Sequence, residues 1–420
     1  MSKNKSSFHF AWIVLIGLSI MAGFARGGIN TAGGLFLTPV SQDLKIGMGS
    51  LTLYFSISAL VILIFLPLAG KMMAKYEIKF LLIIATILQA GSFAMFGFMN
   101  SVWGWYIFSI PMAIGSIFVA QMAGPVLINN WFKKSNGLAI GIMMAAVGLF
   151  GAVLQPLAGN LIASEGWRST YKILGVVVIA VVVPVILLTI RKTPRDKGLQ
   201  PYGGEVESTG DQDAVSFDER GVTAAVARKS SAFYALVLFF FLITSVGSFA
   251  PHVGPFAMGL GYDVQFAGNV MGSFMLGLLI GSLMFGFMSD KIGAKNTAIF
   301  AMVTGLVAVA LLIMFAANPL VFRIGIGIYG FVTASIGVLG PLLTSAVFGN
   351  REYSQIYATA AIGLAVAGIV ALPAYGFVYD LAGSYTPVLY TIAVMLILNI
   401  GAVIFAFRGK KKLEQEGLWN

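Results

Sequence analysis

The segment GFMSDKIGAK, residues 286–295, is a short polar interruption between two long apolar runs. A second segment of similar design, GKMMAKYEIK, occupies residues 70–79, which lie 216 positions earlier in the chain. Each segment joins the second and third apolar runs of its own half of the sequence. This internal repeat predicts a chain built from two related halves with the same order of elements.

The composition around these segments is far too apolar for an ordinary soluble fold. Hydrophobic residues make up 58% of the 420 residues and charged residues 10%, whereas about 25% charge is usual in soluble chains. Many runs exceed the ~20 apolar residues that cross a ~30 Å hydrocarbon core. Helices satisfy every backbone polar group within such a run, and the ~10-residue alternating strands of a membrane barrel do not occur. We therefore predict an all-α membrane protein.

Twelve membrane-spanning helices can be placed along the chain. A polar stretch rich in glycine, proline and acidic residues, residues 191–231, separates six of them from the other six and is predicted to be a flexible cytoplasmic linker. It divides an N-terminal six-helix bundle (1–190) from a C-terminal six-helix bundle (232–407), which a cytoplasmic tail (408–420) follows. The predicted spans are residues 10–40, 49–70, 80–99, 104–130, 137–162, 171–190, 232–259, 265–288, 297–315, 319–346, 355–378 and 386–407.

The basic residues indicate how these helices are oriented. With the N-terminus in the cytoplasm, 21 of the 26 lysines and arginines fall in cytoplasmic segments, and only Lys45, Arg168 and Lys172 fall in outer ones. Cytoplasmic loops carry such an excess, so both termini are predicted to be cytoplasmic. The net charge of +10 follows from this topology and does not indicate nucleic-acid binding, because the basic residues are spread over six loops and tails. Short loops and the lack of a targeting segment favour a multi-pass protein of a bacterial cytoplasmic (inner) membrane.

The segment Gly286–Lys295 resembles the signature loop of the major facilitator superfamily of transporters. In that family the loop helps to latch the cytoplasmic ends of neighbouring helices, which implies a gating role for Asp290. The first-half copy departs from the pattern, with Ala74 at the acidic position and Glu77 at the second glycine. The resemblance implies the major facilitator fold, in which two pseudo-symmetric six-helix bundles rock about a central site.

Further motifs resemble the monocarboxylate and oxalate/formate branch of this superfamily. The branch implies a small organic anion, a mono- or dicarboxylate, as the substrate. In related carriers an arginine of the eighth span, four residues before the motif glycine, binds the substrate carboxylate, but Ser282 stands there in this chain. The eleventh span also lacks the lysine that oxalate exchangers use. The motifs that carry the resemblance are Asn130–Lys134, Gly166–Arg168, Thr193–Leu199, Phe348–Tyr353 and Tyr379–Tyr385.

Arg26, in the stretch GFARGGIN near the middle of the first span, is the candidate for the missing cation. A charge at that depth is costly and normally faces a watery cavity or a partner. The planar guanidinium suits a carboxylate, and no acidic residue lies well inside a predicted span to serve as a structural partner. Satisfaction by neighbouring carbonyls is the alternative. Asn30 lies one helical turn beyond Arg26 and is expected to share its face.

Uncharged polar residues within other spans complete the expected substrate site. Gln121 and Gln155 lie in the fourth and fifth spans, and Tyr329 and Thr333 lie one turn apart in the tenth. Such groups can orient a substrate, and hydrogen bonds between helices are the alternative.

Two further residues are candidates for coupling or gating. His252, in the outer half of the seventh span, could titrate near neutral pH and couple protons to transport, or it could be a plain hydrogen-bonded histidine beside the helix-breaking Pro251. Arg323 opens the tenth span near the outer surface, where an arginine can serve function or simply extend its head group to the interface.

Enzymatic chemistry and cofactors are not expected. The chain has no cysteine and two distant histidines, so no metal centre is predicted, and a phosphate-binding loop of the form G-x-x-x-x-G-K-[ST] is absent.

The distribution of carboxylates bears on the transport mechanism. With no carboxylate inside a span, exchange or facilitated diffusion is favoured over carboxylate-mediated proton coupling, and the carrier is expected to be monomeric. A carrier or exporter of lipophilic or amphipathic compounds, including bulky acids, is the first alternative, and a non-transporting membrane sensor is the second.

Overall fold

The computed structural model describes residues 9–132, 135–203, 221–349 and 351–419. The chain divides into two compact units. Unit 1 comprises Met1–Ala32 and Leu60–Thr209, and unit 2 comprises Gly33–Ala59 and Gly210–Asn420. Over the described residues both units are built from helices, with two isolated backbone bridges and no extended strand.

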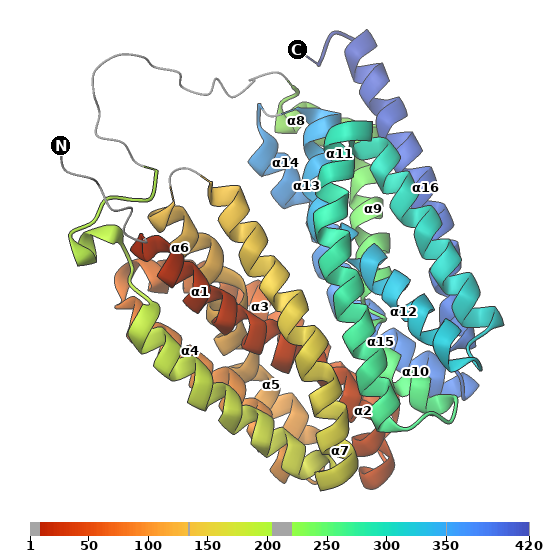
Figure 1. Ribbon diagram of the computed structural model, residues 1–420. Coiled ribbons are helices and arrows are strands. Elements are labelled where there is room, and N and C mark those ends of the chain that lie inside the picture. Colours follow the sequence, from red (N-terminus) through yellow and green to blue (C-terminus); the bar gives the residue numbers. More distant parts are fainter. Residues whose placement is uncertain (1–8, 133–134, 204–220, 350, 420) are drawn as a thin grey trace. The chain divides into compact units, whose positions relative to one another are not determined.

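The first half of the chain, coloured red to yellow-green in Figure 1, supplies unit 1 and the opening part of unit 2. Its first and fourth spans are each interrupted by a π-helical segment, in which the helix is wider than an α-helix. The elements are α1 (Phe10–Ala22), η1 (Gly23–Asn30), α2 (Thr31–Leu44), α3 (Met48–Lys75), α4 (Ile78–Met95), η2 (Phe96–Phe98), α5 (Val102–Ser116), η3 (Ile117–Met122), α6 (Ala123–Trp131), α7 (Asn136–Thr189) and η4 (Pro194–Lys197).

The second half of the chain completes unit 2. Its seventh span is broken into two helices by a short 3-10 turn that contains Pro251. The elements are α8 (Ala224–Lys229), α9 (Ser231–Gly247), η5 (Ala250–His252), α10 (Val253–Gly259), α11 (Val264–Met314), α12 (Pro319–Thr333), α13 (Ser335–Phe348), α14 (Tyr353–Ala360), α15 (Ile362–Ala382) and α16 (Thr386–Gln415).

Ten helices of the described residues are long and apolar enough to cross a bilayer, and two of them are of double length. These two span 52 and 51 residues, which at about 1.5 Å per residue is more than twice the thickness of the hydrocarbon core. Each reverses at one glycine with a positive φ: Gly166 in α7 (φ 75°) and Gly293 in α11 (φ 80°). Both reversals fall between predicted spans, so the prediction of an all-α fold with twelve membrane-spanning segments is confirmed.

The two signature segments turn the chain by different means. At Gly293 the positive φ, which glycine adopts without steric cost, lets the eighth span run directly into the ninth. In the first-half copy Glu77 occupies that position, and its carboxylate accepts the Phe80 N–H at 2.8 Å, so it caps the N-terminus of α4. Glu77 therefore replaces a glycine turn with a helix cap.

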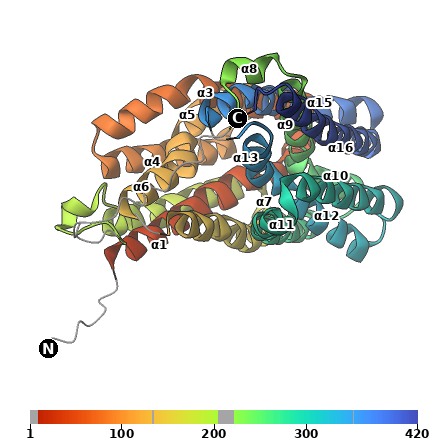
Figure 2. The same cartoon turned by 90° about the horizontal axis from the view of Figure 1, so that it is seen from above.

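Close approach of backbones holds helices together within each unit. In unit 1 a Cβ atom at Gly27 would collide with the carbonyl oxygen of Val147, and in unit 2 a Cβ at Gly277 would collide with that of Gly327. The second contact lies between α11 and α12, which run side by side in both views (Figures 1 and 2). Small residues allow such packing in membrane helices, where no hydrophobic effect drives helices together.

Both described ends of the linker pack against a unit, which differs from the predicted flexibility. In unit 1, Asn130 Nδ2 and the Trp131 indole donate to the carbonyls of Lys192 and Arg191, and the Tyr202 N–H donates to the Trp131 carbonyl at 2.8 Å. Residues of the Asn130–Lys134 motif thus hold the first part of the linker at one end of the unit.

The far end of the linker is held in a similar way in unit 2. The Val222 N–H donates to the Phe348 carbonyl at 2.9 Å, and the Ala224 N–H donates to the Glu352 carboxylate at 2.7 Å. Residues 204–220, the middle of the predicted linker, lie outside the described residues.

Candidate functional site

The π-helical segment η1 carries Arg26 in the middle of the first membrane span. A π-helix pairs each carbonyl with the N–H five residues on, and isolated π segments are frequent at functional sites. The Thr31 hydroxyl follows the same spacing and donates to the Arg26 carbonyl at 2.9 Å. Side chains of other spans add further hydrogen bonds to the carbonyls of η1.

Two buried glutamines supply those hydrogen bonds. Gln155 Nε2 donates to the carbonyl of Gly27 at 2.8 Å, and Gln89 Nε2 donates to that of Ala25 at 3.2 Å. Gln155 was predicted to orient a substrate, and here its amide nitrogen supports η1, while its Oε1 has no partner among the described residues. Gln89 was missed, although it is also a polar residue within an apolar run.

Asn30 joins three spans of unit 1. Its Nδ2 donates to Ser116 Oγ at 3.0 Å, and its Oδ1 accepts from Gln89 Nε2 at 2.9 Å. Asn30 was predicted to share the face of Arg26, but it is half-buried in this network while Arg26 is exposed. Asn30 therefore helps to hold η1 against the third and fourth spans.

Arg26 itself makes one weak side-chain contact. Its Nη1 lies 3.9 Å from Met144 Sδ, a poor acceptor, and no carboxylate of the described residues lies within 4.0 Å of its guanidinium. Gln121, in the second π-helical segment η3, is also exposed. The structure thus leaves most of the hydrogen-bond donors of Arg26 available to water or a ligand.

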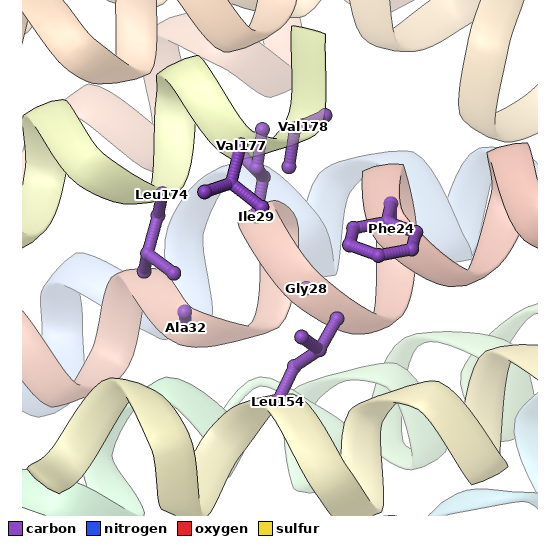
Figure 3. A pocket seen from close by; sticks show the side chains of 8 residues that line it. All are labelled: Phe24, Gly28, Ile29, Ala32, Leu154, Leu174, Val177 and Val178. Carbon is purple, nitrogen blue, oxygen red and sulfur yellow. The ribbon is translucent and has the colours of Figure 1, made fainter. Parts of the chain in front are cut away.

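The small cavity beside η1 is unsuited to a substrate. Its volume is about 20 Å³, and all eight residues that line it are apolar (Figure 3). A single water needs about 10–15 Å³ and two or more polar partners, so an apolar void of this size stays dry. Gly28 and Leu154 border it, and Arg26 does not line it.

His252 is completely buried in the broken seventh span of unit 2. Its Nε2 lies 2.9 Å from the Leu372 carbonyl and its Nδ1 lies 2.9 Å from the Tyr385 hydroxyl. A carbonyl can only accept, so Nε2 carries a proton, and in the neutral form of the ring Nδ1 accepts from the Tyr385 hydroxyl. Both ring nitrogens are therefore used within unit 2.

Tyr329 of the tenth span also supports that break, because its buried hydroxyl donates to the Val246 carbonyl. The Tyr375 hydroxyl donates to the neighbouring Ser245 carbonyl at 2.8 Å. The carbonyls of Ser245 and Val246 lie at the end of α9, where the regular helical partners are lost. Thr333 Oγ1 donates to the Tyr329 carbonyl at 2.8 Å, within its own helix. Tyr375 was missed by sequence reasoning.

The two remaining candidates, Arg323 and Asp290, lie apart from these networks on the surface of unit 2. Arg323 is exposed, and its Nε donates to Ser273 Oγ at 2.8 Å. Asp290 is exposed near the cytoplasmic end predicted for the eighth span, and no hydrogen bond or ion pair of its side chain occurs within the described part of the chain.

Asp380, from one of the branch-like motifs, has a role that the sequence did not indicate. Its two carboxylate oxygens accept the N–H groups of Met48 and Gly49 at 2.8 and 2.7 Å. These are the first N–H groups of α3, where the helix dipole favours a negative charge. All three residues belong to unit 2.

Comparison with known proteins assigns this helical chain to a protein family. The family model of the Major Facilitator Superfamily matches residues 15–272 and 236–418. The chain therefore belongs to the major facilitator superfamily; it is a multi-pass membrane transporter and not an enzyme.

Two bacterial relatives match over most of their length. YhjX of Escherichia coli (strain K12), an uncharacterized MFS-type transporter, is 23% identical over 363 residues, which cover 85% of this chain and 86% of YhjX. YcxA of Bacillus subtilis (strain 168), of the same description, is 21% identical over 422 residues, 98% of each chain.

Solved structures share the fold at low sequence identity. The nucleoside transporter NupG superposes with a TM-score of 0.74 at 12% identity, over 95% of this chain and 99% of NupG. A bacterial homologue of the human lysosomal transporter Spinster, in an inward-facing and unoccupied conformation, superposes with a TM-score of 0.72 at 16% identity. The superposition covers 98% of this chain and 99% of the Spinster homologue.

Proposed function

We propose that this transporter carries a small organic anion, a mono- or dicarboxylate, and that Arg26 recognises its charge. The observation that carries the proposal is an exposed arginine at mid-span whose guanidinium has one weak contact within the described residues. A charge at that depth is stabilised by water or by an anionic ligand. The fork of the guanidinium matches a carboxylate with two parallel hydrogen bonds. The motifs that resemble the monocarboxylate and oxalate/formate branch support the same substrate class.

In this proposal the contacts of the other predicted site residues decide whether each one meets the substrate or supports the site. Gln121 is exposed and is assigned to substrate orientation. Asn30 and Gln155 act indirectly, because their hydrogen bonds hold the segment that carries Arg26. His252 and Tyr329 keep the broken span of unit 2 in place through theirs.

Transport by alternating access with exchange or facilitated diffusion fits the distribution of titratable groups. No acidic residue lies well inside a predicted span, and both nitrogens of His252 are engaged. A carrier without a titratable group on the substrate path moves its substrate down that substrate's own gradient or against a counter-substrate. We assign gating, and not proton coupling, to the exposed Asp290.

Counterflow in proteoliposomes tests the proposal. Vesicles are loaded with one of a panel of unlabelled carboxylates, and uptake of the labelled form is followed without an ion gradient. We expect saturable counterflow that Arg26→Gln abolishes and Arg26→Lys partly retains, since lysine keeps the charge and loses the fork. Arg408→Gln, the same change at an exposed arginine beyond the last predicted span, is the control and should transport normally. Normal counterflow by Arg26→Gln would remove Arg26 from charge recognition.

A carrier of amphipathic compounds, including bulky acids, is the second candidate. The observation in its favour is the absence of any basic residue from the eighth span, where Ser282 stands in place of the arginine of monocarboxylate carriers. Well-folded protein that shows no counterflow with any small carboxylate, but does with a bulky amphipathic acid, would select this candidate.

We also propose that the chain is a monomer of two six-helix bundles whose termini are both cytoplasmic. The distribution of Lys and Arg supports the orientation. Because the chain has no cysteine, single cysteines report sidedness without background. A membrane-impermeant maleimide should label Glu165→Cys in intact cells and Glu416→Cys only after permeabilisation; the reverse pattern would invert the topology.

A further inference from the structure

A long groove runs along unit 2 between α11 and α12. Its volume is about 820 Å³, and residues from both halves of α11 and from α12 line it. The helices are in parallel register along it: Arg323 bonds to Ser273, and Cβ atoms at Gly277 and Gly281 would collide with the carbonyls of Gly327 and Phe331. The groove therefore has a defined direction, with Arg323 toward one end and Phe331 toward the other.

The groove is deep because glycine forms part of its floor. A Cβ at Gly327 would meet only the carbonyl oxygen of Ser273, at 3.6 Å, so this position opens into space. The walls are exposed apolar side chains, among them Ile280 (51% exposed) and Val307 (51%). In a membrane-spanning unit such a surface accommodates hydrocarbon, because lipid tails are as apolar as these side chains.

One cation breaks this apolar surface. Arg323 lines the groove, and its Nε is fixed by Ser273 Oγ at 2.8 Å. Its two Nη groups make no hydrogen bond or ion pair with the described residues, and no carboxylate lines the groove. An arginine held this way presents a planar pair of donors to a phosphate or carboxylate oxygen.

The dimensions match one leaflet of a bilayer. From Leu320 to Phe331 the groove follows α12 for about 16 Å at about 1.5 Å per residue, and half of a ~30 Å hydrocarbon core is about 15 Å. In the predicted orientation Arg323 lies toward the outer surface, where the head groups lie. A lipid phosphate at Arg323 would thus leave an acyl chain of that leaflet lying along the groove.

We propose that this groove is a binding site for an anionic phospholipid of the surrounding bilayer. Its phosphate is held by the Nη groups of Arg323, and one acyl chain packs over Gly327 between α11 and α12. The site shares no residue with the transport site proposed at Arg26, because all of its residues belong to unit 2 and Arg26 belongs to unit 1. It neither requires nor excludes an organic-anion substrate.

Native mass spectrometry of the full chain, released from detergent with added lipid, tests the proposal. We expect phosphatidylglycerol to be retained about tenfold more strongly than phosphatidylcholine, the ratio that one charge-assisted pair supplies. Arg323→Gln should reduce the phosphatidylglycerol retention to that of phosphatidylcholine. Gly327→Leu should lower retention of both lipids, since its side chain enters the groove and its Cβ meets the Ser273 carbonyl oxygen only at a van der Waals distance of 3.6 Å.

Gly401→Leu is the matched control, because Gly401 is an exposed glycine of α16 with open space around its Cβ position. It should retain both lipids as the wild type does. An unchanged preference for phosphatidylglycerol in Arg323→Gln would overturn the head-group assignment. Two results would overturn the acyl-chain assignment and leave a simple anion site. One is complete displacement of the lipid by inorganic phosphate, and the other is retention of both lipids by Gly327→Leu at the wild-type level.

Discussion

The side-chain amide of Gln155 donates a hydrogen bond of 2.8 Å to the carbonyl oxygen of Gly27, the residue after Arg26. Gln155 is completely buried, so this bond forms where no water competes for it. Gly27 belongs to the π-helical segment, whose carbonyls lack the regular partners of an α-helix. The placement of the proposed charge-recognition residue therefore depends on a glutamine that lies 128 positions after Gly27 in the chain.

Gln155→Leu is predicted to destabilise the transporter and to impair substrate recognition together. Leucine has a similar volume but no donor, so the Gly27 carbonyl is left without its partner at a cost of ~1–3 kcal/mol. The thermal unfolding midpoint should fall by several degrees, and the KM for counterflow should rise as η1 loses its fixed geometry. Differential scanning fluorimetry and counterflow on the same preparation measure both effects.

Gln121→Leu is the control for stability. Gln121 is exposed and lies in the other π-helical segment, so the same substitution there should leave the unfolding midpoint unchanged. An equal fall of the unfolding midpoint in both variants would show that the hydrogen bond from Gln155 to Gly27 does not contribute specifically to stability.

The spans and their boundaries could be predicted because they depend on local composition. Hydropathy defines the apolar runs, and a glycine at each double-length helix marks the reversal: Gly166 lies between the predicted fifth and sixth spans, and Gly293 lies between the eighth and ninth. The docking of the linker could not be predicted. Tyr202 bonds to the backbone of Trp131, and only the folded unit brings a glycine-rich and proline-rich stretch to that surface.

The candidate site was only partly predictable for the same reason. The cost of a charge in lipid singled out Arg26 without any structure. No sequence pattern separates a π-helix from an α-helix in GFARGGIN. The side-chain hydrogen bonds to the carbonyls of this segment therefore could not be predicted. Gln89 and Gln155 were equivalent as polar residues in apolar runs, and the packing that points both amides at η1 decides their role.

His252→Gln is predicted to leave the pH dependence of transport unchanged between about pH 5 and 8, the range over which an ordinary histidine titrates. The imidazole is buried with both nitrogens bonded inside unit 2, so it is not available to exchange protons with the transport path. The unfolding midpoint should fall, because glutamine cannot keep both bonds at the same geometry.

Tyr385→Phe supplies the comparison for His252. It removes the hydroxyl that donates to Nδ1, so its effect on stability should resemble that of His252→Gln, and the double variant should lose less than the sum of the two. A flattened pH profile in His252→Gln with the wild-type profile in Tyr385→Phe would instead assign proton coupling to the histidine.

Asp196 makes the docking of the linker sensitive to acid. Burial alone would raise the pKa of Asp196, but hydrogen bonds from the Thr193 N–H (3.0 Å) and hydroxyl (2.8 Å) favour the carboxylate and hold its pKa below the ordinary value. A lowered pKa means that the stabilisation is complete at neutral pH and is lost as the pH falls through that lowered value.

Asp196→Asn should therefore speed amide hydrogen exchange at Leu199 and Tyr202 at neutral pH. The Leu199 N–H is bonded to the Pro194 carbonyl within this segment, and the Tyr202 N–H is bonded to the Trp131 carbonyl, against which the segment docks. Acid should have the same effect on the wild type, after correction for intrinsic exchange rates, and little effect on the variant. Glu416→Gln, at an exposed carboxylate of the C-terminal tail, is the control. Equal protection of Leu199 in wild type and Asp196→Asn would refute the role of the carboxylate.

Asp380 fixes the start of a helix that both units share. Its carboxylate holds the N–H groups of Met48 and Gly49 in unit 2, whereas the same helix, α3, belongs to unit 1 from Leu60 onward. We therefore predict that the Asp380 carboxylate holds the first turn of α3 in place within unit 2.

Asp380→Asn should release this turn, because an amide offers one acceptor where the carboxylate offers two and it loses the charge that the helix dipole favours. Leu51, in the same turn, is 1% exposed, so Leu51→Cys should react several-fold faster with a soluble maleimide when Asp380→Asn is added. The absence of native cysteine keeps the background low. Asp263→Asn is the control, since Asp263 accepts the Phe266 N–H at 2.6 Å and caps a different helix, α11. Unchanged labelling of Leu51→Cys in the Asp380→Asn background would mean that packing, and not the carboxylate, holds the start of α3.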